Sequence, residues 1–87
     1  MRFENKELLK KYLKSVICSV LEREINISEN TKLTSHGLDS LMIVSLVVAL
    51  EGDLGIAFND EHLMLDIFDN VESLSNLLLE NYGVIEG

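Results

Sequence analysis

The sequence predicts an all-α domain: a four-helix bundle with three main helices, one short helix and a long loop between the first two. Apolar residues recur at helical spacing in several segments, and no segment alternates with the period of two that is typical of strands. The 87 residues include no proline and only five glycines, so long helices meet few strong breakers. At this length the whole chain, residues 1–87, is expected to form a single domain.

The first helix is expected over residues 6–21, where apolar side chains recur at the i, i+3 and i+4 spacing of an amphipathic helix. Asn5 is a suitable N-cap, because its side chain can accept a hydrogen bond from an otherwise unpaired amide of the first turn. The lysines of this segment are interpreted as a solvated face: Lys6, Lys10, Lys11 and Lys14.

Residues 22–39 lose the helical period and are rich in turn and cap residues, so they are expected to form a long loop. A loop of this length needs anchors in so small a domain, and the apolar candidates are Ile25, Ile27 and Leu33. Long loops in compact domains are often functional.

The second helix is expected over residues 40–51, with either Asp39 or Ser40 as its N-cap and with Gly52 and Gly55 around its end. A short third helix is expected over residues 60–65, after Asn59.

The last helix is expected over residues 71–82, with Asn70 as its N-cap and Glu72 placed favourably for the helix dipole. Gly83 is expected to end it. Its predicted inner face consists of Leu74, Leu77, Leu78 and Tyr82.

The second helix carries more apolar residues than one buried face requires. At about 3.6 residues per turn, these residues fall on two arcs separated by Ser40. The expected core-facing arc holds Ile43, Leu46, Val47, Leu50 and Leu54. The second arc holds Leu41, Val44 and Val48. It either packs under the long loop or stays partly exposed as a docking patch, and the small size of the bundle favours exposure.

The net charge of −8 is distributed unevenly. Residues 1–38 hold all seven basic residues and five acidic ones, whereas residues 39–87 hold ten acidic residues and no Lys or Arg. Nucleic acid is not an expected partner, because phosphate binding needs Lys and Arg. The acidic half either steers basic proteins toward it or only keeps the domain soluble.

The single cysteine, Cys18, excludes an internal disulfide and is compatible with a reducing compartment. The longest apolar stretch, residues 41–50, is interrupted by Ser45 and is too short to span a bilayer. No signal-peptide core is recognised. We therefore expect a soluble, cytoplasmic monomer without a membrane span.

No catalytic site and no metal site are expected. Ser40, His36 and Asp39 crowd one loop and lack the Gly-x-Ser-x-Gly elbow of a hydrolase. Cys18, His36 and His62 lack the fourth ligand and the spacing of a zinc site.

Residues 37–41, Gly-Leu-Asp-Ser-Leu, precede an apolar helix that ends in Ala-Leu-Glu at residues 49–51. This motif resembles the modification site of acyl carrier and peptidyl carrier proteins, and the helix pattern, length and acidity of the whole chain are similar to that family. The resemblance implies that Ser40, flanked by Asp39 and Leu41, receives a covalent 4′-phosphopantetheine arm from coenzyme A through a phosphopantetheinyl transferase. The arm would hold an acyl or aminoacyl group as a thioester.

The resemblance also implies two kinds of contact with the transferase and with acyl- or aminoacyl-loading and condensing enzymes. Leu41, Val44 and Val48 would supply an apolar contact. Acidic residues would meet basic patches on these partners: Glu51, Asp53, Asp60 and Glu61.

The chain departs from primary fatty-acid carriers at three positions of the second helix, where Met42, Ser45 and Gly52 replace expected acidic residues. A dedicated carrier in a specialised polyketide, nonribosomal-peptide or D-alanine-type pathway therefore fits better. The alternatives are a primary fatty-acid carrier and a helical protein-interaction module without a prosthetic group.

Overall fold

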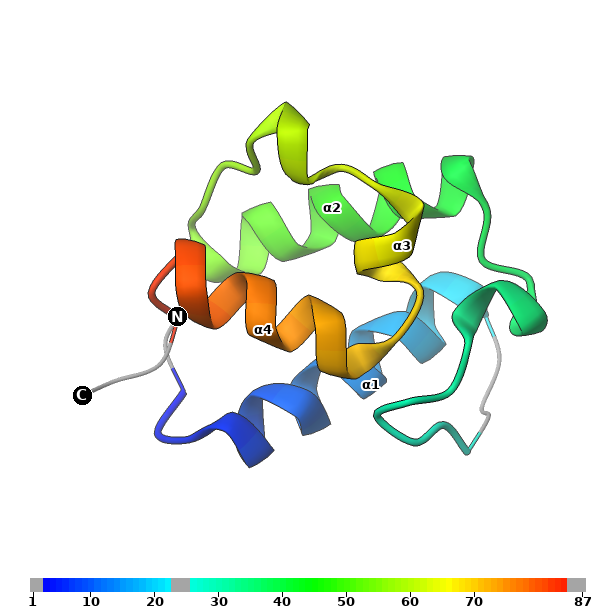
Figure 1. Cartoon of the computed structure of the whole chain (residues 1–87), viewed down its shortest axis with the longest axis horizontal. Coiled ribbons are helices and arrows are strands. Elements are labelled where there is room, and N and C mark those ends of the chain that lie inside the picture. Colours follow the sequence, from blue (N-terminus) through cyan, green and yellow to red (C-terminus); the bar gives the residue numbers. More distant parts are fainter. Residues whose placement is uncertain (1–2, 23–25, 85–87) are drawn as a thin grey trace.

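The computed structural model describes residues 3–22 and 26–84, which form a bundle of three long helices and one short helix (Figure 1). The helices are α1 (Lys6–Leu21), α2 (Ser40–Leu54), α3 (Leu65–Phe68) and α4 (Val71–Asn81). Two 3-10 turns, η1 (Leu33–His36) and η2 (Asp60–His62), lie in the connections. The predicted fold class is confirmed.

Asparagine caps begin both outer helices, as predicted. Asn5 Oδ1 accepts from the amide of Leu8 at 3.0 Å and starts α1. Asn70 Oδ1 accepts from the amide of Ser73 at 2.7 Å and starts α4. Each bond satisfies one of the amides that a first helical turn leaves unpaired.

The end of α2 lies further along the chain than predicted. The helix continues through Gly52 to Leu54 and ends at Gly55, whose φ of 66° is easily adopted by glycine. Leu54 is buried, so packing of the last turn against the core outweighs the weak helix propensity of Gly52.

The predicted helix over residues 60–65 is wrong in position. That segment contains the turn η2, and the short helix α3 follows it at Leu65–Phe68. The physical reason is burial: residues 60–65 include no buried side chain, whereas Phe68 is fully buried.

Helix α1 packs against both α2 and α4, and α3 packs against α4 and α2. The long loop after α1 is anchored by buried Ile27, Leu33 and Leu38, whereas the third candidate anchor, Ile25, lies outside the described residues. The amide of Leu33 also donates to the carbonyl of Asp69 at 2.6 Å, which ties the loop to the junction of α3 and α4. The loop therefore holds the start of α2 in a fixed place.

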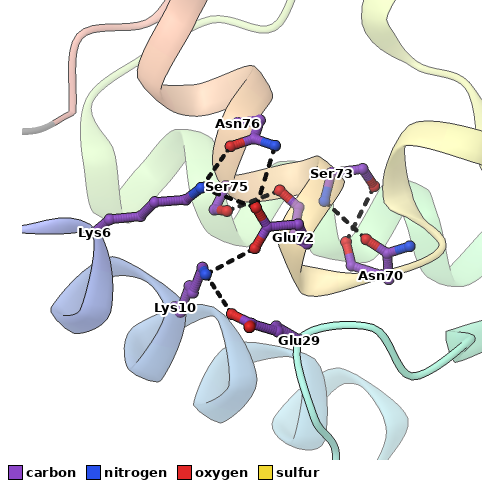
Figure 2. A network of polar contacts seen from close by, with 8 residues as sticks. All are labelled: Lys6, Lys10, Glu29, Asn70, Glu72, Ser73, Ser75 and Asn76. Atoms are coloured by element: carbon purple, nitrogen blue, oxygen red, sulfur yellow. Dashed lines mark hydrogen bonds and ion pairs between the residues drawn. The ribbon is translucent and has the colours of Figure 1, made fainter.

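Lys10 corrects the interpretation of the α1 lysines as a solvated face, because it is buried between two carboxylates (Figure 2). Its Nζ donates to Glu29 of the long loop and, at 2.7 Å, to Glu72 Oε2 of α4. Lys6 Nζ donates to Glu72 Oε1 at 2.9 Å and to Asn76 Oδ1 at 2.8 Å. We call Lys6, Lys10, Glu29 and Glu72 the lysine–glutamate network.

The network favours the charged forms of its members. The hydrogen bonds that the Lys10 ammonium donates to Glu29 and then to Glu72 raise the pKa of Lys10. Hydrogen bonds from Lys10 and then Lys6 lower the pKa of Glu72 to about 2. The network thus joins α1, the long loop and α4 by charge-assisted bonds.

The two ends of the described chain meet. The amide of Phe3 donates to the carbonyl of Val84 at 2.8 Å, which closes the bundle beside the ends of α1 and α4. Among the helices described, none combines the length and apolar character needed to cross a membrane.

Candidate functional site

The start of α2 is built by a tight turn that leads out of η1. Gly37 adopts a φ of 100°, Leu38 is buried, and Asp39 takes the extended conformation of an N-cap. Asp39 Oδ1 accepts from the amide of Met42 at 3.0 Å, and the Asp39 carbonyl accepts from the amide of Ile43 at 2.9 Å. Of the two N-cap candidates, the structure therefore selects Asp39.

Ser40 is the first residue of α2 and is exposed. Within residues 3–22 and 26–84, its hydroxyl makes no hydrogen bond, because Asp39 already caps the helix. The first turn of a helix favours negative charge, owing to its unpaired amides and the dipole. The hydroxyl is thus accessible at an end of α2 that suits a phosphate group.

The two predicted arcs of α2 are separated as the helical wheel indicates. Leu41, Val44 and Val48 are 80%, 61% and 63% exposed, which excludes the alternative that they pack under the long loop. We call these three residues the apolar ridge. The core-facing arc is buried throughout: Ile43, Leu46, Val47, Leu50 and Leu54.

An apolar cavity of about 220 Å³ opens beside Ser40. One wall comes from α2, and the facing wall comes from Leu63, before α3, and from Leu65, the first residue of α3. Its lining consists of Ser40, Ile43, Val44, Val47, Val48, Leu63 and Leu65. The only hydroxyl among these residues is that of Ser40, so a group attached there would lie at the cavity.

The sequence reasoning did not single out Leu63 and Leu65. The sequence does show an apolar run at residues 63–65. The prediction of a short helix over residues 60–65 hid the fact that this run is exposed.

The four predicted partner-binding carboxylates differ in their surroundings. Glu51 is half-buried and its Oε2 accepts from the amide of Phe58 at 2.8 Å. Asp53 Oδ2 accepts from the Tyr12 hydroxyl at 2.8 Å, and burial, followed by this bond, raises the pKa of Tyr12. Asp60 and Glu61 are exposed in η2. Two of the four carboxylates therefore already hold the fold together.

His36 and His62 lie in different turns, η1 and η2. His62 Nδ1 lies 2.8 Å from the Tyr82 hydroxyl. Within the described part of the chain, no group of three or more His, Cys, Asp and Glu residues is arranged to hold a metal ion.

Comparisons with known proteins agree with this geometry. The family described as "Phosphopantetheine attachment site" matches residues 11–78, and the chain belongs to this family. The chain is 41% identical over 59 residues to a protein of Mycoplasma genitalium named "Acyl carrier protein homolog". That match covers 64% of this chain and 64% of the relative's own length. No solved structure matches the chain.

The residues at the start of α2 fit the prosthetic group that this family carries. The exposed Ser40 hydroxyl is free to form a phosphodiester, and the amides of Ser40 and Leu41 have no hydrogen-bond partner among the described residues. The apolar cavity lies directly beside that hydroxyl.

Proposed function

We propose that the chain is a non-catalytic carrier in which Ser40 bears the 4′-phosphopantetheine arm. The observation that carries this proposal is the exposed, unbonded Ser40 hydroxyl at the start of α2, inside the family match and beside an apolar cavity. When bound, the arm supplies a thiol that holds an acyl or aminoacyl group as a thioester. The protein contributes position: Asp39 fixes the helix start, and Ser40 presents its hydroxyl to a transferase.

The transferase and the acyl- or aminoacyl-handling enzymes would dock beside Ser40. Leu41, next to the modified residue, would contact them together with Val44 and Val48 of the apolar ridge. Exposed Asp60 and Glu61 would add long-range attraction toward basic partner surfaces, with Glu51 and Asp53 contributing to the same acidic field. In this proposal the carrier works as a cytoplasmic monomer.

The pathway proposed first is a specialised polyketide, nonribosomal-peptide or D-alanine-type pathway. It is supported by α2, whose first three turns carry no charged side chain and which has Met42, Ser45 and Gly52 where primary fatty-acid carriers usually place acidic residues.

A primary fatty-acid carrier is the second candidate, and the cavity favours it. A space of about 220 Å³ lined by aliphatic side chains fits an apolar acyl chain better than a charged aminoacyl group. Loading the arm with fatty-acyl groups and offering it to primary fatty-acid enzymes separates the candidates. Turnover as efficient as with their own carrier would support the second.

The attachment itself is tested by intact mass after incubation with coenzyme A and a transferase of broad specificity. We expect a gain equal to one arm in the wild type and none in Ser40→Ala. Ser45→Ala is the matched control, because Ser45 is also exposed on α2 and should not affect the gain. A folded wild-type protein that gains no mass would instead support an interaction module without a prosthetic group.

A further inference from the structure

The wall of the cavity that faces α2 belongs to a strap, defined here as residues 59–67, whose two ends meet in the core. The strap is flanked by Phe58 and Phe68, which are both buried and whose ring centroids lie 5.8 Å apart. None of residues 59–67 is itself buried, although Leu63 and Leu65 line the cavity. Residues 59–64 of the strap form a surface loop outside the α-helices, and such a loop opens at low free energy, whereas residues 65–67 belong to α3. The far end of the strap is held by α3 and by the Ser73 hydroxyl, which donates to the Ile67 carbonyl at 2.6 Å. The position of its first half, residues 59–64, therefore depends on polar contacts.

Two consecutive backbone amides fix the start of the strap to α2 and to the residue that follows α4. The amide of Phe58 donates to Glu51 Oε2 of α2 at 2.8 Å. The amide of Asn59 donates to the hydroxyl of Tyr82, which follows the last residue of α4, at 2.8 Å. Figure 1 shows the segment that follows α2 passing beside the end of α4.

The Tyr82 hydroxyl also reaches further along the strap. A backbone amide can only donate, so the Tyr82 oxygen accepts from Asn59 and its hydrogen remains available for His62 Nδ1, 2.8 Å away. When the Tyr82 hydroxyl donates in this way, His62 carries its hydrogen on Nε2. The two rings stand nearly perpendicular, at 83°, with centroids 5.7 Å apart. His62 immediately precedes Leu63 of the cavity wall.

We propose that Tyr82 and His62 are positioning residues that hold the strap against α2. They thereby set the width of the apolar cavity beside Ser40 and the apolar groups that it admits. The assignment of the cavity to cargo rests on the proposed function. The tie between Tyr82, Asn59 and His62 does not, so it is tested on the full chain without the arm.

The first measurement is amide hydrogen exchange of residues 62–65 by NMR in Tyr82→Phe, which removes the hydroxyl and keeps the ring. Loss of the tie should speed exchange there by about five- to thirtyfold, the factor expected for one or two hydrogen bonds. Exchange in the middle of α1 should stay unchanged. Tyr12→Phe is the matched control, because it removes a hydroxyl that bonds Asp53 away from the cavity and should leave the strap unaffected.

The second measurement is xenon binding, followed by methyl shifts of Val44, Val47 and Leu63, because xenon occupies apolar cavities. The affinity of the cavity for xenon should fall about fivefold in Tyr82→Phe, because the strap would no longer be held against α2. Unchanged strap exchange would overturn the proposal. Faster exchange with unchanged xenon affinity would also overturn it, because the tie would then not set the cavity.

A pair of His62 variants tests the same tie if Tyr82→Phe does not fold. His62→Asn places a carbonyl oxygen where Nδ1 lies and should retain slow strap exchange, whereas His62→Leu should lose it. Equal exchange in both variants would contradict the proposal. None of these measurements uses the arm, so they succeed or fail independently of the mass gain at Ser40.

Discussion

Asp39 and Ser40 separate two tasks at the start of α2. Asp39 uses its carboxylate to satisfy the amide of Met42, and Ser40 therefore keeps its hydroxyl free of intramolecular bonds. A serine that capped its own helix would have to break that bond before modification. The division lets residue 40 change without loss of the helix cap.

We expect Asp39→Ala to lower the free energy of unfolding by about 1 kcal/mol, the usual cost of losing an N-cap. Asp39→Asn should retain most of the stability, because asparagine also caps well. Ser40→Ala should change stability by less than about 0.5 kcal/mol, as is usual for exposed positions without special contacts. Urea unfolding of the three variants tests this order, and a larger loss in Ser40→Ala would refute the assignment of Asp39 as the cap.

Glu72 makes the stability of the fold sensitive to acid. Its pKa is about 2 in the folded protein, lowered by hydrogen bonds from Lys10 and Lys6, against about 4.3 for an unperturbed glutamate. A lowered folded-state pKa gives stability that is complete above the unfolded value and is lost as the pH falls toward the folded value.

We therefore expect the wild type to lose stability between about pH 5 and pH 2, with a contribution that Glu72→Gln lacks. Chemical denaturation across this range measures the difference between the two proteins. Glu61→Gln is the control, because Glu61 is exposed in η2 and outside the lysine–glutamate network. Parallel pH profiles of the wild type and Glu72→Gln would contradict the account.

At the scale of the element, α2 turns one apolar face to the core and a second apolar face to the surface. Leu46 is completely buried, whereas Leu41, on the apolar ridge, is 80% exposed. Hydrophobicity alone does not distinguish these leucines; only their angular positions on the helix do.

We expect Leu46→Ala to destabilise the protein by about 2–5 kcal/mol, because it leaves a cavity in the core. Leu41→Ala should change stability by less than about 0.5 kcal/mol and should instead slow transfer of the arm to Ser40. Urea unfolding and initial rates of mass gain separate the two effects. Wild-type transfer rates in Leu41→Ala would remove the apolar ridge from the proposed docking contact.

Local signals in the sequence predicted the helices whose ends are set locally. Asn5 and Asn70 lie next to clear apolar periods, and α1 and α4 begin after them. The two arcs of α2 were predictable because angular separation depends only on spacing. The motif at residues 37–41 likewise located Ser40 at a helix start.

The features that were missed depend on partners distant in the sequence. Lys10 is buried because Glu29 and Glu72 converge on it from the loop and from α4, and nothing near residue 10 indicates this. The short helix was displaced because Phe68 packs in the core, where it contacts Phe58. The cavity wall also escaped prediction, since it forms only when Leu63 and Leu65 come to face α2.

At the scale of the whole molecule, charge is segregated along the chain. Residues 39–87 carry ten acidic side chains and no Lys or Arg, so the half that contains Ser40 repels anions and attracts basic surfaces. Glu72 is paired within the fold, and Asp53 accepts a bond from Tyr12, whereas Asp60 and Glu61 are exposed.

We expect transfer of the arm to Ser40 to slow as salt rises from about 0.01 M to 1 M, because screening shortens the reach of this field from about 30 Å to 3 Å. Asp60→Asn combined with Glu61→Gln should raise KM at low salt and weaken the salt dependence. Glu22→Gln, a charge change outside the acidic half, is the control. Identical salt profiles for all three proteins would contradict electrostatic steering by η2.

The bond between Phe3 and Val84 has a consequence for engineering. Residues 3 and 84 are held within one hydrogen bond of each other, so a bundle joined to a host protein at these residues spans no more of it than the base of a hairpin does. The bundle can thus be spliced into a surface loop of an unrelated enzyme, or its ends linked and the backbone reopened elsewhere, without unwinding α1 or α4. In such a chimera Ser40 would be presented by a bundle that is covalently joined to its host at both ends.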